Sequence, residues 1–248
     1  MEQTGGIFYH YLALRNSLRY WRNYQGSIET FLSEALSCDK KLLVGPSGGY
    51  SLSKSHFSQI TNKDIIAELD PVARLILKSK LKHNPNWIKH DLFQIGDEPE
   101  ESASFTAGEF KGLGVERIVF CNMLGQLAYQ YPGHSEQFWK NFLSKFLKKL
   151  QLDVYSYHDR WSILASKDYL DSFEENFKSL NLSEKMGLKI KDFCEHTTMK
   201  KSAQQKVEIL DHPTDIFDSM DCRFHAIYPW RRTKNCLHLI HCISLTNL

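Results

Sequence analysis

The residues with the clearest potential for chemistry lie in a glycine-rich turn near residue 45. Apolar residues 42–44 run directly into Gly45-Pro46-Ser47-Gly48-Gly49, a pattern typical of a buried parallel strand followed by a tight turn. Glycines in such a turn let the backbone approach a ligand without interference from a Cβ atom. We therefore expect Gly45, Ser47 and Gly49 to form a ligand-binding loop.

Three further short runs each end in a polar side chain. The runs and their last residues are 64–70 with Asp70, 87–91 with Asp91, and 116–122 with Asn122. If these runs are parallel strands, their carboxyl ends meet at one edge of a sheet, which is where ligands bind in open α/β folds. Each residue also has a structural interpretation. Asp70 precedes Pro71 and fits a helix N-cap, whereas Asp91 and Asn122 fit turns.

The elements that position these residues alternate between strand and helix. Residues 8–36 predict one or two leading helices with a break at Gly26-Ser27, Pro71 opens a helix, and residues 135–150 predict an amphipathic helix with Phe138, Phe142, Phe146 and Leu150 on one face. Residues 94–114 show no convincing period and predict a loop with a short helix. Residues 152–157 predict a fifth strand that ends at His158-Asp159, residues 168–210 predict helix, and residues 225–243 predict a hairpin. This pattern indicates a mostly parallel sheet with an antiparallel edge.

This arrangement resembles the class I S-adenosylmethionine-dependent methyltransferases over most of the chain. The resemblance implies an α/β fold: a Rossmann-like, mostly parallel seven-stranded sheet with helices on both faces, an antiparallel C-terminal hairpin and extra N-terminal helices. It also implies one methyltransferase-like domain over residues 1–248, with a helical cap at 1–37, the core at 38–248 and a helical insertion at about 168–210. The implied cofactor is S-adenosylmethionine.

The resemblance assigns cofactor contacts to residues at the ends of the predicted strands. Gly45, Ser47 and Gly49 would pack against the methionine part, and Asp70 would accept hydrogen bonds from the ribose hydroxyls, with Glu68 as the nearest alternative. Asp91 would read the adenine amino group, and Asn122 would face both the cofactor and the acceptor. The chain departs from the family in two places: Leu43 or Val44 stands where an acidic residue usually precedes the loop, and Ser47 replaces the middle glycine.

Methyl transfer is a direct displacement at carbon, so it needs alignment and, for a protonated oxygen or nitrogen acceptor, a base. His158 is the candidate base, Asp159 would orient it or an incoming amine, and Asn122 would lie beside the acceptor. A solvated loop or a salt bridge is the structural alternative for His158 and Asp159. The acceptor, a small molecule or a protein, is not specified by the sequence.

Two other functions remain open. A catalytically silent methyltransferase-like binding module would explain the missing acidic residue before the loop. The same turn also spells G-x-S-x-G through Gly45, Ser47 and Gly49, the nucleophile pattern of serine hydrolases, although only helical sequence precedes it. Dinucleotide and Walker loops are excluded because the required glycines and the Gly-Lys-Ser sequence are absent.

Composition limits the partners. The formal charge of +2 gives no basis for nucleic-acid binding, and no apolar run is long enough for a membrane span. The six cysteines include no C-x-x-C pair, so we expect reduced thiols in a soluble, cytoplasmic protein. Cysteines and histidines crowd the predicted C-terminal hairpin, but their spacing matches no common zinc site, and we expect no metal.

Overall fold

The chain folds around one mixed β-sheet. The structure, a computed structural model, describes residues 6–181, 190, 192–194, 207–212, 214–220 and 222–246. In these residues the sheet has eight strands in the order β3-β2-β1-β4-β5-β8-β7, and β6 pairs with β5 beside this path. The first five strands are parallel, whereas β6 and β8 are antiparallel to β5, and β7 is antiparallel to β8. The predicted fold class is confirmed, with one strand more than the seven expected.

The strands are short where the sheet is parallel and long where it is antiparallel. Their bounds are β1 Lys41–Val44, β2 Ile65–Ala67, β3 Asn86–Ile88, β4 Arg117–Cys121, β5 Asp153–Leu164, β6 Glu208–Asp211, β7 Phe224–Thr233 and β8 Cys236–Leu245. Every residue of β1 is buried, as expected for a parallel strand covered on both faces.

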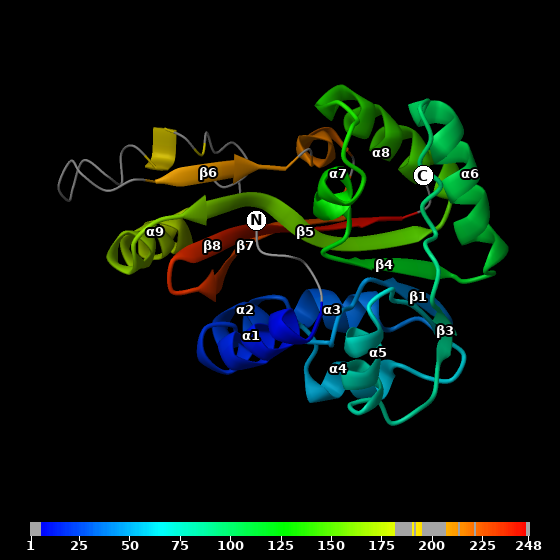
Figure 1. Cartoon of the computed structure of the whole chain (residues 1–248), viewed down its shortest axis with the longest axis horizontal. Coiled ribbons are helices and arrows are strands. Elements are labelled where there is room, and N and C mark those ends of the chain that lie inside the picture. The colour runs from blue at the N-terminus through cyan, green and yellow to red at the C-terminus, as the bar shows by residue number, and fades with distance from the viewer. Residues whose placement is uncertain are drawn as a thin grey trace.

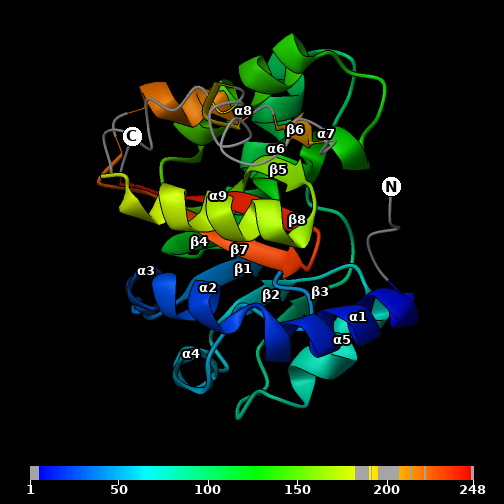
Figure 2. The ribbon, with the colours of Figure 1, turned by 90° about the vertical axis from the view of Figure 1, so that its left-hand side faces the viewer.

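Helices cover both faces of the sheet (Figure 1). One face carries α1 Gly6–Arg19, α2 Arg22–Ser27, α3 Glu29–Ala35, α4 Lys54–Gln59 and α5 Pro71–Lys78, and the other carries α6 Pro99–Gly112, α7 Leu127–Gln130 and α8 Glu136–Leu150. Figure 2 shows the two layers from the side, with α9 Lys167–Ser179 near the turn that joins the end of β7 to the start of β8. Two 3-10 helices complete the described part: η1 Leu124–Gln126 and η2 Asp215–Ser219. Across the described ranges, no helix combines the length and the apolar character that a membrane span requires.

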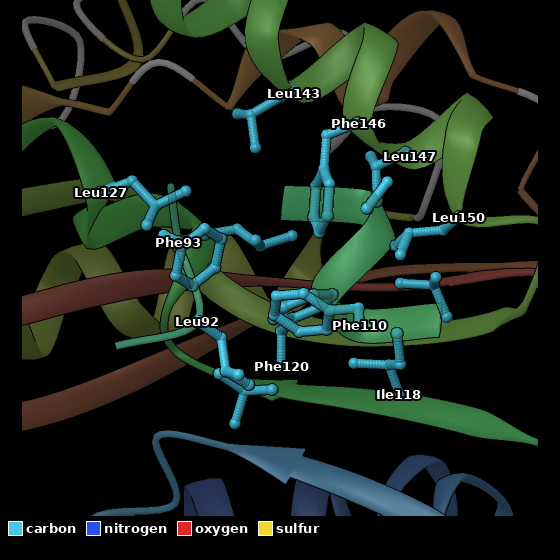
Figure 3. Packing of buried hydrophobic residues seen from close by; sticks show 14 of the residues in the cluster. Leu92, Phe93, Phe110, Ile118, Phe120, Leu127, Leu143, Phe146, Leu147 and Leu150 are labelled. Atoms are coloured by element: carbon cyan, nitrogen blue, oxygen red, sulfur yellow. The ribbon is translucent and has the colours of Figure 1, made fainter. Parts of the chain in front are cut away.

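The amphipathic stripe predicted for residues 135–150 forms the centre of one core. Phe138, Phe142, Phe146 and Leu150 are all buried in α8, whose N-cap Ser135 accepts a hydrogen bond from the Phe138 amide. Figure 3 shows how Phe146 and Leu150 point toward Phe110 and the sheet. Removing this apolar stripe from water attaches α8 to β4 and β5.

The prediction of a loop with a short helix over residues 94–114 is wrong in the length of the helix. Residues 99–112 form the 14-residue helix α6, which starts at Pro99 and has glutamates in its first turn. Its buried face consists mostly of small residues, including Ala103, Thr106 and Ala107, with Phe110 at the end. Small residues give a weak apolar period in the sequence, yet they let α6 lie close to α8.

Strand β5 is twice as long as predicted. It continues through His158 and Asp159 to Leu164, because β8 pairs with it along this length and β6 pairs with its last four residues. A bulge between Asp159 and Trp161 shifts the register of the β5–β8 pair. His158 and Asp159 therefore lie within a strand, and the expected end of the strand before them is wrong.

The region predicted to be helical between residues 168 and 210 is helical only in part of its described residues. Helix α9 covers residues 167–179, and residues 190 and 192–194 are also helical. Residues 208–210 belong to β6 instead of a helix. The helix predicted for residues 182–189, 191 and 195–206 lies outside the described part of the chain.

Candidate functional site

The glycine turn follows β1 directly and has the strained backbone that its sequence suggests. Gly45, Ser47 and Gly49 have φ values of 65°, 53° and 68°, all in the left-handed region. The Gly45 amide donates to the Ala67 carbonyl at 2.8 Å, which fixes the turn beside the end of β2. A Cβ on Gly49 would lie 2.8 Å from Leu77 Cδ1, so this position has room only for glycine.

Glu68 anchors the turn from the end of β2. Its Oε2 accepts the Ser47 amide at 2.8 Å, and its Oε1 accepts the Asp70 amide at 3.0 Å. The residue is only 8% exposed, and burial raises the pKa of its carboxyl group against the lowering effect of these two amides. Each carboxylate oxygen has a second acceptor position, so Glu68 retains capacity for two more donors.

Asp70, the predicted ribose ligand, is placed at the start of α5. Its Oδ1 accepts the Val72 and Ala73 amides at 2.8 and 3.3 Å, which makes it the N-cap of this helix. Its Oδ2 lies 3.1 Å from Nε2 of His10. Both oxygens of Asp70 thus already have protein partners, and its role toward a ribose remains a prediction.

Helix α1 lies across the glycine turn. Nδ1 of His10 is 2.9 Å from the Tyr50 hydroxyl, so His10 links Tyr50 to Asp70. Burial raises the pKa of Tyr9, while Arg232 and a hydrogen bond with the Ser47 side chain oppose that rise. Tyr9 therefore lies over the turn itself. Helix α1 therefore covers the candidate loop, and the cap over residues 1–37 as a unit stays a prediction.

Asn122 and Asp159 meet at the carboxyl ends of β4 and β5. Asn122 has a φ of 58°, and its Oδ1 accepts the Asp159 amide at 2.9 Å while its Nδ2 donates to Asp159 Oδ2 at 3.3 Å. Gln126 Nε2 also donates to Oδ2. A Cβ on Gly125 would lie 2.7 Å from the Asp159 carbonyl oxygen, so the backbone after β4 packs directly on β5. The amide side chains hold the Asp159 carboxylate in one orientation.

The Asp159 carboxylate forms a buried ion pair with His238. Asp159 is 1% exposed, and its Oδ1 lies 2.9 Å from His238 Nδ1. Burial favours the neutral form of each group, but the mutual attraction outweighs it: the pKa of Asp159 lies well below its usual range, and the pKa of His238 rises to about 9. Both groups are therefore charged at neutral pH.

His158, the predicted base, lies on the other face of the sheet. Adjacent strand residues point to opposite faces, so His158 is turned away from Asp159. It is completely buried, with Nδ1 2.9 Å from Ser156 Oγ and its ring centroid 4.6 Å from that of Phe217. Burial lowers the pKa of His158 to about 3, so the imidazole is neutral.

Asp91 lies near the end of β3, apart from the glycine turn. Its Oδ1 accepts the Phe93 amide at 2.9 Å, and the Tyr131 hydroxyl after α7 donates to its Oδ2. The structure thus brings Gly45, Ser47, Gly49, Glu68 and Asp70 together in one group. Asn122 and Asp159 form a second group next to it, whereas His158 and Asp91 belong to neither.

Sequence reasoning missed several members of this region. His238 and Gln126 hold Asp159, and Tyr9 and His10 cover the turn. Tyr9, His10 and His238 are distant from the site in sequence and gave no local signal, whereas Gln126 follows Asn122 by only four positions. In the part of the chain that the structure describes, no group of three or more histidines, cysteines or carboxylates is arranged to hold a metal ion.

A cavity of about 250 Å³ opens nearby, between α7, α8 and the segment after β6. Its lining residues include Tyr129, Trp139, Asp211 and His212. His212 connects this cavity to the Asp159 region, because its Nδ1 is 3.0 Å from the Gly125 carbonyl and its Nε2 is 3.0 Å from Ser162 Oγ.

Comparisons with known proteins place the chain beside methyltransferases of solved structure. No protein-family model and no curated protein matched the sequence. An S-adenosylmethionine-dependent methyltransferase from Clostridium acetobutylicum ATCC 824 is similar at 9% identity and a TM-score of 0.37, with 68% of this chain and 62% of that chain covered. The sugar N-methyltransferase KedS8 from Streptoalloteichus sp ATCC 53650 matches at 14% identity and a TM-score of 0.35, over 63% of this chain and 55% of that chain.

A third structure covers more of both proteins. The N-methyltransferase NodS from Bradyrhizobium japonicum WM9, in complex with S-adenosyl-l-homocysteine, matches at 10% identity and a TM-score of 0.42, over 90% of this chain and 86% of that chain. The chain spans less than two thirds of the length of the first two structures. Because all three TM-scores are below 0.5, what this chain binds must be inferred from its own residues.

Proposed function

We propose that this chain binds S-adenosylmethionine at the carboxyl ends of β1 and β2 and transfers its methyl group to a small-molecule or protein acceptor. The observation that carries this proposal is the position of Glu68. Its carboxylate lies between the strained glycine turn and the start of α5, and each oxygen keeps one free acceptor position. Two acceptors on one carboxylate match the two vicinal hydroxyls of a ribose.

The surrounding residues fit the other parts of the cofactor. Gly45, Ser47 and Gly49 present backbone without bulky side chains to the methionine part. Asp70 would contribute to the ribose contact beside Glu68. Asp91 lies outside this group and holds the Phe93 amide and the Tyr131 hydroxyl, so it would reach the adenine amino group only if these contacts rearrange. Binding requires rearrangement, since Met123 packs against Gly45 and α1 covers the turn. Met123 has the flexible side chain that such a movement needs.

When bound, the cofactor supplies an electrophilic methyl carbon. The chain must then align the acceptor and exclude water. Asn122 and Asp159 would bound the acceptor side of the site, with Asp159 as a fixed negative charge for a cationic or polar acceptor. His158 is completely buried on the opposite face of the sheet from Asp159, so we do not propose it as the base of this site.

Calorimetry with S-adenosylmethionine tests the cofactor proposal. We expect saturable heat with the wild-type chain and its loss in Glu68→Gln, because an amide has one acceptor oxygen in place of two. Glu116→Gln, which changes an exposed glutamate, is the matched control and should bind like wild type. A folded wild-type chain that gives no heat would overturn the proposal.

The silent binding module is the competing function, and its support is Leu43 or Val44 where an acidic residue is expected. A transfer assay separates the two, since binding without formation of S-adenosylhomocysteine across amine, hydroxyl and peptide acceptors favours the silent module. The hydrolase alternative places its nucleophile at Ser47, whose side chain has the Tyr9 phenol as a hydrogen-bond partner. Labelling of Ser47 by a fluorophosphonate would favour it.

A further inference from the structure

The start of β8 brings a thiol, an imidazole and a carboxylate into one line. Cys236 Sγ lies 3.3 Å from His238 Nε2, and His238 Nδ1 lies 2.9 Å from Asp159 Oδ1. This is the order of groups in an activated cysteine: the sulfur that attacks, an imidazole beside it and a carboxylate that orients the imidazole. None of these contacts involves the glycine turn.

The antiparallel part of the sheet produces this line. Cys236 and His238 are two residues apart on β8, so their side chains lie on the same face. The register pairs Ser162 with His238, and the bulge in β5 lies between Asp159 and Trp161, just before this pair. Ser162 Oγ lies 3.1 Å from His238 Nδ1 and 3.0 Å from His212 Nε2, which further fixes the imidazole.

The charge of His238 determines which hydrogen bonds its ring donates. Because Asp159 keeps His238 protonated at neutral pH, both ring nitrogens donate hydrogen bonds. The Nε2 proton then points at the sulfur of Cys236. The sulfur thus has a cationic hydrogen-bond donor 3.3 Å away, the kind of neighbour found beside reactive cysteines.

The other cysteines have different surroundings. Cys121, Cys194 and Cys242 are buried, and burial raises the pKa of Cys121 and Cys242. Cys38 is partly exposed, as Cys236 is, but burial is the main cause of its raised pKa. Cys38 therefore serves as an internal reference for a thiol of similar exposure without such activation.

We propose that Cys236 is a nucleophilic thiolate, activated by His238 and positioned through Asp159, that takes small soft electrophiles at its sulfur. With an alkyl iodide the sulfur–carbon bond forms as the carbon–iodine bond breaks, and iodide leaves with the electron pair. No oxidant or reductant is needed. The site shares Asp159 with the acceptor side of the proposed methyl-transfer site, but its reaction needs no cofactor, so thiol labelling tests it separately from cofactor binding.

Iodoacetamide labelling of the intact chain, followed residue by residue with mass spectrometry, tests this site. At pH 7 we expect Cys236 to react about tenfold faster than Cys38 in the native protein. In His238→Gln the rate at Cys236 should fall to that of Cys38, whereas the rate at Cys38 should stay unchanged and report an intact fold. Equal rates at the two cysteines in wild type would overturn the proposal.

The wild-type pH profile gives a second test that needs no variant. An unactivated thiol loses about tenfold in rate for each pH unit below its titration, because the thiolate is the reacting form. We expect the rate at Cys236 to change less than threefold between pH 8 and pH 6.5, while Cys38 slows with the full slope. Parallel profiles for the two residues would contradict a thiolate–imidazolium pair.

Discussion

His238 and a cluster of three histidines, His158, His225 and His241, lie on opposite faces of the sheet, and His238 is charged whereas the cluster is neutral. On the face covered by α1 and α2, His238 pairs with Asp159 and its pKa rises to about 9. On the face covered by η2, burial lowers the pKa of His158, His225 and His241. Burial acts on all four rings, and only a carboxylate at hydrogen-bond distance reverses it.

The cluster shows what burial does without that carboxylate. His158 and His241 pair across β5 and β8, their ring centroids are 5.1 Å apart, and the ring of His225 stacks on His241 at 4.4 Å. Neither ring nitrogen of His241 has a hydrogen-bond partner within the described ranges. Three adjacent imidazoles at this spacing cannot all be protonated, so this face remains neutral. The comparison teaches that strand alternation decides which histidine faces the Asp159 carboxylate, and that this carboxylate decides which histidine is charged.

Removal of the carboxylate should have the largest effect. We expect Asp159→Asn to lower the free energy of unfolding by about 3 kcal/mol or more, because it takes one partner from a buried ion pair. Urea denaturation at pH 7 measures this loss, and NMR titration should show the pKa of His238 falling. Asp39→Asn, which breaks the exposed pair with Lys63, is the control and should leave the urea midpoint unchanged. Equal midpoints for the two variants would contradict the assigned role of Asp159.

The pH dependence of stability should separate the two faces. The pKa of His238 is raised, so its contribution is complete below about pH 6.5 and is lost as pH rises through about 9. The neutral histidines have lowered pKa values, so their contribution is lost as pH falls below about 6.5, when the unfolded chain binds protons. Each histidine changes the free energy of unfolding by about 1.4 kcal/mol per pH unit within its window.

Urea denaturation between pH 4.5 and pH 9.5 measures the free energy of unfolding on both sides of neutral pH. We call its decrease at high pH the alkaline limb and its decrease at low pH the acid limb. His238→Gln should flatten the alkaline limb and leave the acid limb between pH 6.5 and pH 4.5 in place. An unchanged alkaline limb in this variant would show that the ion pair does not control it.

Replacement of a neutral histidine should have the smallest effect. We expect His241→Phe to leave the free energy of unfolding unchanged or to raise it by about 1 kcal/mol, because two buried nitrogens without partners are removed. The acid limb should also become shallower. The control is His56→Phe, since His56 is equally buried but hydrogen-bonded to Ser33 and Ser53, and it should lose about 1 to 2 kcal/mol. If both substitutions cost the same, unpaired nitrogens do not distinguish His241.

The sequence by itself determined the features that depend on near neighbours. Backbone strain at the glycine turn, the buried stripe of α8 and the start of α5 at Pro71 all follow from residues a few positions apart. The same local reasoning gave the alternation of strands and helices and the C-terminal hairpin, and with them the fold class. It failed at α6, where small residues hide the helical period.

Only the tertiary structure decided which side chains meet. The length of β5 depends on pairing with β8 and β6, and that pairing placed His158 and Asp159 on opposite faces. Glu68 reaches Ser47 across 21 positions, and Asp159 reaches His238 across 79. Hydrogen bonds and ion pairs act over a few ångströms in space at any sequence separation, so their partners are fixed by strand register and packing rather than by local pattern.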